Sequence, residues 1–313
     1  MKLAIAFPVF LVVLLAACTP AAPAVIPAAP ASTLMPTSTA FPIPTDTLTK
    51  TATPTLVYTP TTTPTPTLDT RPLPYNWSSW PVVPSVSARA VEIYRTGLRL
   101  GVTPNTFSVI GDCQSKPDVF MGIYATDRNP IGKNFPDLLE TINVFRESFL
   151  HDSVAVKDGF GPASVLSPLQ TDTSRCDATE SPLTCELRLY KPMIVFINLG
   201  TNWRADASVD AYETYLRKIV DQIIASGAVP ILTNKADNVE GNHGINLVTA
   251  QVAYDYDIPL MNFWLVSDSL PDHGLDFNRT PPSVYLTPAG WDARNFNALR
   301  TLDSVWRGLT STP

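Results

Sequence analysis

The chain has 313 residues, a formal net charge of −6 and 45% hydrophobic residues. This acidic balance argues against nucleic acid as a partner, because binding to phosphates requires a basic face. The composition changes twice along the chain, which divides it into three regions.

Residues 1–18 have the pattern of an export signal. Lys2 supplies a short positive segment, and an apolar stretch over residues 3–15 follows it. The stretch is shorter than the roughly 20 residues that a helix needs to cross a bilayer, so it indicates a signal peptide. It leads into the letters LAAC, which end at Cys18 and resemble a bacterial lipobox. The resemblance implies a lipoprotein that is cleaved before Cys18 and anchored to the outer side of the cell membrane by lipid on that residue. The alternative is an ordinary signal peptide with a chance cysteine.

Residues 19–74 predict a disordered stalk. They consist mainly of Pro, Thr, Ala and Ser, with little charge and few large apolar side chains. Such a segment does not bury enough surface to offset the entropy lost on folding. Its prolines favour extended polyproline-II geometry, so we expect a spacer between the membrane and a folded domain.

Residues 75–313 predict one folded domain of about 240 residues, a normal size for a single α/β sheet. Short apolar runs indicate strands, and apolar residues at helical spacing indicate helices. Strands are expected at 107–110, 153–156, 193–199, 229–233 and 259–263, and helices at 91–100, 138–149, 209–225, 245–256 and 288–309. Alternating strands and helices predict a doubly wound, flavodoxin-like α/β/α sandwich with a parallel sheet of about five strands. Ligands in such sheets bind at the carboxyl ends of the strands.

The four cysteines fit an exported protein. Cys176 and Cys185 lie nine positions apart in a polar segment, and in an oxidising compartment they would plausibly form a disulfide. A zinc pair is the alternative, but no histidine or further cysteine lies near them. With Cys18 taken by lipid, Cys113 is the one unpaired thiol.

Three loops at predicted strand ends carry a family resemblance. The first strand is followed by GDC at 111–113, the second by KDGFG at 157–161, and the third by GTN at 200–202. In their order and spacing these motifs resemble three blocks of the SGNH/GDSL hydrolases, which act on ester bonds. The resemblance covers most of residues 105–310.

The resemblance implies a role for each motif. Cys113 takes the position of the nucleophilic serine, and Asp112 orders the turn around it. The N–H of residue 113, a glycine N–H from Gly159 or Gly161, and the side-chain amide of Asn202 would stabilise the oxyanion of an acyl transfer. The alternative for Asn202 is a turn residue that bonds its own loop, and the glycines are also typical of tight turns.

Several positions depart from the family pattern. Cys113 replaces serine; a thiol is a competent nucleophile once ionised, but a buried cysteine that fills space is an equal alternative. Tyr285 stands where the family has its basic histidine and Pro282 where it has the aspartate; a phenol is a poor base at neutral pH. Trp203 replaces the second acid of the third block and would line the cleft as an apolar or sugar-stacking wall, or simply pack there.

A histidine to replace the missing base must come from elsewhere. His273, in the loop after the last strand, is the best candidate, oriented by Asp272 or Asp276. His243 follows the fourth strand and would line the mouth of the same cleft. For each of these two histidines the alternative is an exposed loop residue.

Two functions therefore remain open. The first is an extracytoplasmic esterase or carbohydrate esterase with catalytic Cys113, His273 and Asp272, acting on small-molecule or glycan esters. The second is a surface module that binds glycans or other envelope ligands in a cleft without catalysis. No paired spacing of metal ligands and no phosphate-binding glycine loop occur, so we expect neither metal nor cofactor.

Overall fold

The computed structural model describes residues 69–313, except 133–134, 205, 280–283 and 312–313. Residues 67–313 form one compact unit. The expected signal peptide, its Cys18 and the stalk up to residue 68 lie outside the described residues, as does Pro282.

Helices and strands alternate along this unit. In chain order they are α1 (Ala88–Leu100), β1 (Thr103–Gly111), α2 (Pro136–Val144), α3 (Pro162–Val165), α4 (Pro182–Tyr190), β2 (Pro192–Asn198), α5 (Val209–Ala225), β3 (Val229–Thr233), α6 (Gly244–Tyr256), β4 (Leu260–Met261), α7 (Phe263–Asp268) and α8 (Pro288–Thr310). Short 3₁₀ turns connect several of them, including one at Cys113–Ser115 directly after β1.

The four strands form one parallel sheet in the order β1-β2-β3-β4. Val156 adds a single parallel bridge to Gly111 on the free side of β1. Counting that bridge, the chain order across the sheet is 2-1-3-4-5, as in flavodoxin-like folds. The expected α/β fold with a parallel sheet is thus confirmed, but the strand expected at 153–156 is reduced to one bridge.

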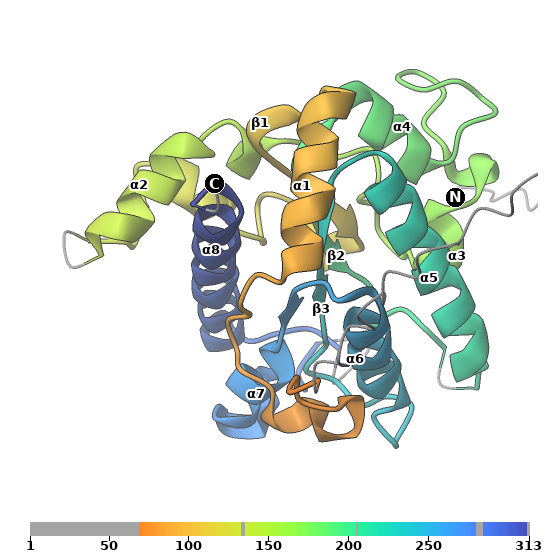
Figure 1. Ribbon diagram of the computed structural model, residues 1–313. Coiled ribbons are helices and arrows are strands. Elements are labelled where there is room, and N and C mark those ends of the chain that lie inside the picture. The colour runs from red at the N-terminus through yellow and green to blue at the C-terminus, as the bar shows by residue number, and fades with distance from the viewer. Residues whose placement is uncertain (1–68, 133–134, 205, 280–283, 312–313) are drawn as a thin grey trace, which may run out of the picture. The chain divides into compact units, whose positions relative to one another are not determined.

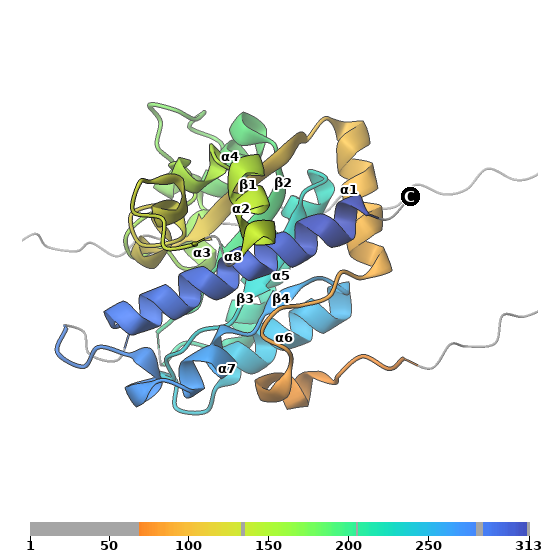
Figure 2. The same ribbon diagram turned by 90° about the vertical axis from the view of Figure 1, so that its left-hand side faces the viewer.

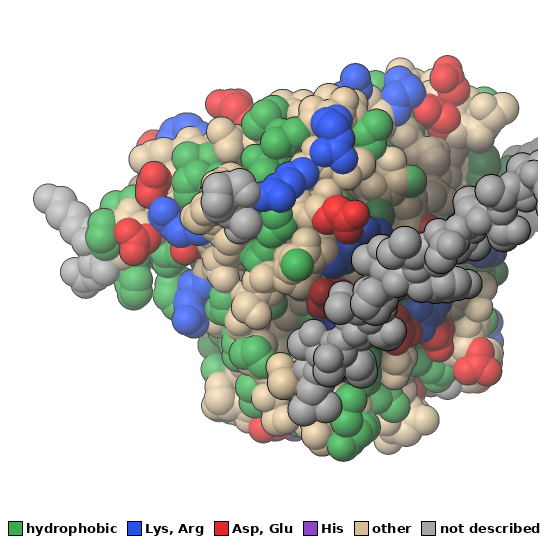
Figure 3. All heavy atoms as spheres, in the orientation of Figure 1, with side chains coloured by type: hydrophobic (Ala, Val, Ile, Leu, Met, Phe, Trp, Pro, Cys, Tyr) green, Lys and Arg blue, Asp and Glu red, His purple; other side chains and the backbone are tan. Residues whose placement is uncertain are grey.

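Two layers of helices cover the sheet. Figures 1 and 2 show α2 and α8 on one face, and α5 and α6 on the other. The contacts agree, since α5 and α6 touch each other and β3, whereas α8 touches β4, α2 and α1. On the surface seen in Figure 3, Lys and Arg side chains are interspersed with Asp and Glu.

The sheet is central because its strands are apolar on both sides. Every residue of β2 is buried, which is typical of a parallel strand between two helical layers. On α5, Tyr212, Leu216 and Ile219 belong to the buried stripe that faces the sheet. Ser208 caps this helix by accepting a hydrogen bond from the Ala211 N–H, which fixes where α5 begins.

The expected disulfide is confirmed: Cys176 and Cys185 are bonded, and Cys113 is the free cysteine among the described residues. Cys185 lies within α4, a helix that the sequence analysis missed. Ser181 caps α4 in a capping box with Thr184, and Pro182 occupies its first turn. Within the described range no helix is long and apolar enough to cross a membrane.

Candidate active site

The turn after β1 is built for close packing. A Cβ on Gly111 would lie 2.1 Å from the Ser115 Oγ and 2.8 Å from the Asn198 carbonyl oxygen on β2. Glycine is therefore required here, because the turn folds back against the neighbouring strand. This turn carries Asp112 inward and leaves Cys113 half-buried at its start.

Asp112 is the hub of the site. Its side chain is 4% exposed. Oδ1 accepts a hydrogen bond of 2.8 Å from the Gln114 N–H, and Oδ2 accepts one of 3.0 Å from the Asn202 Nδ2. Burial raises the pKa of Asp112, while the Gln114 N–H and the positive charge of Arg294 oppose that rise. The carboxylate thus joins the loop after β1 to the loop after β2.

The second block also reaches this point. Gly111 accepts a backbone hydrogen bond from Lys157, which places the following loop beside the turn. The Asn202 Nδ2 donates to the Phe160 carbonyl oxygen at 3.3 Å, between Gly159 and Gly161. The three loops predicted from the sequence therefore meet at one amide group. Both N–H donors of that amide are engaged, so Asn202 holds the loops together in this arrangement.

Arg294, on α8, is a site residue that the sequence analysis missed. Its Nη1 donates to the Gln114 carbonyl oxygen at 2.7 Å, and its guanidinium lies 4.6 Å from the centre of the Phe120 ring. Burial lowers its pKa to about 10, and the negative charge of Asp112 opposes that change. The available signal was its position three residues after Trp291, within the apolar stripe of the helix.

The surroundings of Cys113 disfavour its thiolate. Burial raises the pKa of the thiol, and the negative charges of Asp112 and Asp158 add to the rise. Lys116 acts in the opposite direction but is paired with Asp158 at 2.6 Å. At neutral pH the sulfur therefore carries its proton.

A small polar cavity lies beside the turn, at the carboxyl ends of the strands. Its volume is about 30 Å³, roughly the space of one water molecule. Buried Asn198 lines it, and its Nδ2 has no hydrogen-bond partner in the described structure. Charged side chains of both signs contribute to the wall, from Asp112, Lys235, Asp237 and Arg294.

The proposed base lies in a different pocket. His273 lines a hollow with His243, Trp264 and Phe277, and neither Cys113 nor Asp112 borders it. The His273 Nδ1 lies 3.4 Å from Asp268 Oδ1. The close acidic neighbour recorded for His273 is thus Asp268, and its expected orientation by Asp272 or Asp276 stays a prediction. Asp272 and His273 both have positive φ angles, which turn this segment away from regular structure.

Two further residues predicted for the site, Tyr285 and Trp203, pack against side chains outside the polar cavity. The Arg279 guanidinium lies 4.0 Å from the centre of the Tyr285 ring, while Val284 and Leu286 on either side line the polar cavity. Trp203 packs edge-on against Tyr212 and Tyr215 of α5 and is not part of the cavity wall.

Comparison with known proteins gives structural matches. No protein-family model matches the sequence, and no curated protein matches it. A putative lipolytic protein of the G-D-S-L family from Desulfitobacterium hafniense is 13% identical, with a TM-score of 0.41 over 63% of this chain and 99% of that one. LAE5, an alpha/beta hydrolase from the Lake Arreo metagenome, is 13% identical, with a TM-score of 0.45 over 66% and 98%. The acetylxylan esterase Axe2 from Geobacillus stearothermophilus is 16% identical, with a TM-score of 0.42 over 64% and 95%.

Each of these three structures is less than 20% identical to the chain and has a TM-score below 0.5, so the expected relation to the SGNH/GDSL hydrolases stays a prediction. The catalytic roles of Cys113 and His273 stay predictions.

The electrostatics around Cys113 predict that its thiol ionises only at alkaline pH. Alkylation of Cys113 by iodoacetamide, followed by mass spectrometry of its peptide, should accelerate above the ordinary thiol pKa of about 8.5. Asp158→Asn removes a negative charge and frees Lys116, so the alkylation profile should move to lower pH; Lys116→Ala should move it to higher pH. Asp127→Asn, an exposed control, should leave it unchanged. A wild-type profile below the ordinary thiol range would contradict this account.

Proposed function

We propose that the protein is an SGNH/GDSL-type ester hydrolase with Cys113 as its nucleophile. The observation that supports the proposal is the junction at Asp112, where the loops after β1, after Val156 and after β2 meet beside Cys113. A half-buried thiol at the end of a parallel strand is a position from which a nucleophile could attack an ester carbonyl.

The proposed reaction has two steps. The Cys113 Sγ loses its proton to hydroxide or another base and attacks the ester carbonyl carbon. A C–S bond forms, the C–O bond to the alcohol breaks, and the alcohol leaves with a proton. Water then attacks the thioester and releases the carboxylic acid and the thiol. The raised pKa of Cys113 predicts a rate that increases with pH.

The first experiment measures hydrolysis of p-nitrophenyl acetate by the wild type and by Cys113→Ala. The wild type should exceed the buffer background increasingly at alkaline pH, and Cys113→Ala should fall to that background, because the nucleophile is lost. Asp127→Asn, a change at an exposed position, serves as the control and should retain activity. Equal rates for the wild type and Cys113→Ala would refute the proposed nucleophile.

The alternative is a non-catalytic module that binds envelope ligands on the same fold. It is favoured by the pairing of His273 with Asp268 and by the contact of Tyr285 with Arg279, which leave Cys113 without an identified base. A wild type that binds a glycan or ester ligand without hydrolysing it would support this alternative.

We further propose that the protein works outside the cell on a lipid anchor at Cys18. The LAAC motif and the Pro/Thr-rich segment after it support this location, and the disulfide between Cys176 and Cys185 is compatible with an oxidising compartment. Substrates would then be small-molecule or glycan esters outside the membrane.

The anchor is tested by expression in a bacterial host. The wild type should sediment with membranes and incorporate labelled fatty acid. Cys18→Ala should incorporate no labelled fatty acid, because the residue that carries the lipid is lost. Fatty-acid labelling of Cys18→Ala equal to that of the wild type would exclude Cys18 as the anchor.

A further inference from the structure

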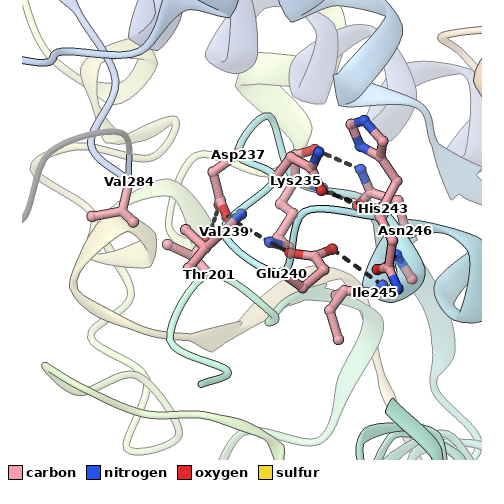
Figure 4. Close-up of polar contacts among 12 residues, drawn as sticks. Thr201, Lys235, Asp237, Val239, Glu240, His243, Ile245, Asn246 and Val284 are labelled. Carbon is pink, nitrogen blue, oxygen red and sulfur yellow. Dashed lines mark hydrogen bonds and ion pairs between the residues drawn. The ribbon is translucent and has the colours of Figure 1, made fainter. Parts of the chain in front are cut away.

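A buried lysine lies at the carboxyl edge of the sheet. Lys235 follows β3, and its side chain is 5% exposed. Its Nζ lies 2.5 Å from Asp237 Oδ1 and 2.6 Å from Glu240 Oε2 (Figure 4). Both carboxylates are buried as well. Charges are removed from water only at a large free-energy cost unless they are paired, so the three groups depend on one another.

The Glu240 arm of this cluster holds α6. Glu240 Oε1 accepts a hydrogen bond of 3.2 Å from the Ile245 N–H in the first turn of that helix. The Asn246 side chain accepts from the Lys235 N–H and donates to the Lys235 carbonyl oxygen, both at 2.9 Å (Figure 4). These bonds fix the backbone of Lys235 and the start of α6, so this arm stabilises the scaffold.

The Asp237 arm leads to the candidate active site. Asp237 Oδ2 accepts a hydrogen bond of 3.0 Å from the Thr201 Oγ1 (Figure 4). Thr201 is the neighbour in the chain of Asn202, whose amide binds Asp112 and the Phe160 carbonyl oxygen. Thr201, Asp237 and Asp112 also line the same polar cavity.

The backbone of the loop that carries Asn202 is restricted by its neighbours. Gly200 has a φ of +124°, a value that L side chains rarely adopt, and a Cβ there would lie 2.9 Å from the Ile245 side chain on α6. The Trp203 N–H bonds the Gly200 carbonyl oxygen at 2.9 Å. The hydroxyl of Thr201 ties this turn to the Lys235 cluster through a side chain.

We propose that Lys235, through Asp237 and Thr201, is a positioning residue that holds Asn202 against Asp112 beside the nucleophile. Lys235 touches no reacting atom in this scheme; its Nζ, 2.5 Å from Asp237 Oδ1, holds that side chain where its Oδ2 accepts the hydrogen bond from Thr201. The catalytic part of the inference rests on the proposed hydrolase function, whereas the positional part stands on the loop itself.

The test is made at Thr201, because removing Lys235 would leave two buried carboxylates without their cation and destabilise the whole domain. Thr201→Val keeps the shape of the side chain and removes the hydroxyl. We expect kcat for p-nitrophenyl acetate to fall about 10- to 100-fold with KM little changed, since misplacement of a site group acts mainly on the chemical step. Hydrogen–deuterium exchange at residues 199–203 should accelerate. Thr201→Ser, which restores the hydroxyl, should recover both.

A matched pair of variants separates positioning from general support. Asp237→Asn and Glu240→Gln each remove one carboxylate from Lys235, but Asp237 alone of the two contacts Thr201. Faster exchange at 199–203 and a lower kcat are expected for Asp237→Asn and not for Glu240→Gln. Arg217→Met, which breaks two 2.6 Å ion pairs on the partly exposed surface of α5, should change neither.

The inference is overturned if Thr201→Val matches the wild type in exchange at 199–203, or if Glu240→Gln accelerates that exchange as much as Asp237→Asn. A wild type without esterase activity would refute the proposed hydrolase, and the exchange comparisons would then still decide whether Lys235 and Asp237 position the loop.

Discussion

The candidate site depends on a buried carboxylate at the end of the first strand. Asp112 is withdrawn from water and compensated by the Gln114 N–H, the Asn202 amide and the nearby charge of Arg294. An unpaired carboxylate would not remain ionised in such a place, so each of these groups has to be held in position. Segments far apart in the chain are thereby joined at one point: β1, the loop after β2, and α8.

The same carboxylate has an opposite effect on its neighbour. Burial raises the pKa of the Cys113 thiol, and the negative charges of Asp112 and Asp158 add to the rise. In the serine hydrolases that the motifs resemble, a histidine removes this proton, and the sequence predicts Tyr285 at that position. In the structure Tyr285 lies under the Arg279 guanidinium, and the His273 Nδ1 lies 3.4 Å from Asp268. A thiol needs less help than a hydroxyl, because its reference pKa is much lower. On the proposed function, a cysteine nucleophile would therefore suit a site without a strong base, with a rate that is low near neutral pH and rises with pH.

Local signals account for much of the fold that was predicted. The helix expected at 209–225 agrees with α5, which has strong apolar periodicity and a serine cap. The strand expected at 229–233 agrees with β3, whose residues are all buried. The strand expected at 153–156 forms a single bridge, and β4 has two residues, because pairing length is decided by neighbours in space. Helix α4 was missed because the polar segment that leads into it, from Cys176 to Cys185, has the composition of a loop.

The site was predicted only in part, because some of its contacts are made between segments far apart in the chain. The motifs placed Asp112, Cys113 and Asn202 at adjoining strand ends, and parallel topology brings such ends together. Which carboxylate pairs with His273 depends on how α7 and the following turn fold back, and the sequence holds no local signal for that. Arg294 lies in the apolar stripe of α8, but the carbonyl oxygen of Gln114 that it binds lies in another part of the chain. The partners of Lys235 are Asp237 and Glu240 of its own loop, and its burial depends on how that loop folds against α6 and Thr201.

The most direct test of the account is the acyl-enzyme intermediate itself. The protein is mixed with p-nitrophenyl acetate at alkaline pH, quenched in acid within the first turnovers, digested and analysed by mass spectrometry. The account predicts one acetyl group on the peptide that contains Cys113, lost again when the quench is delayed until the substrate is consumed. Acetylation confined to surface lysines, with an unmodified Cys113 peptide at every time point, would contradict it.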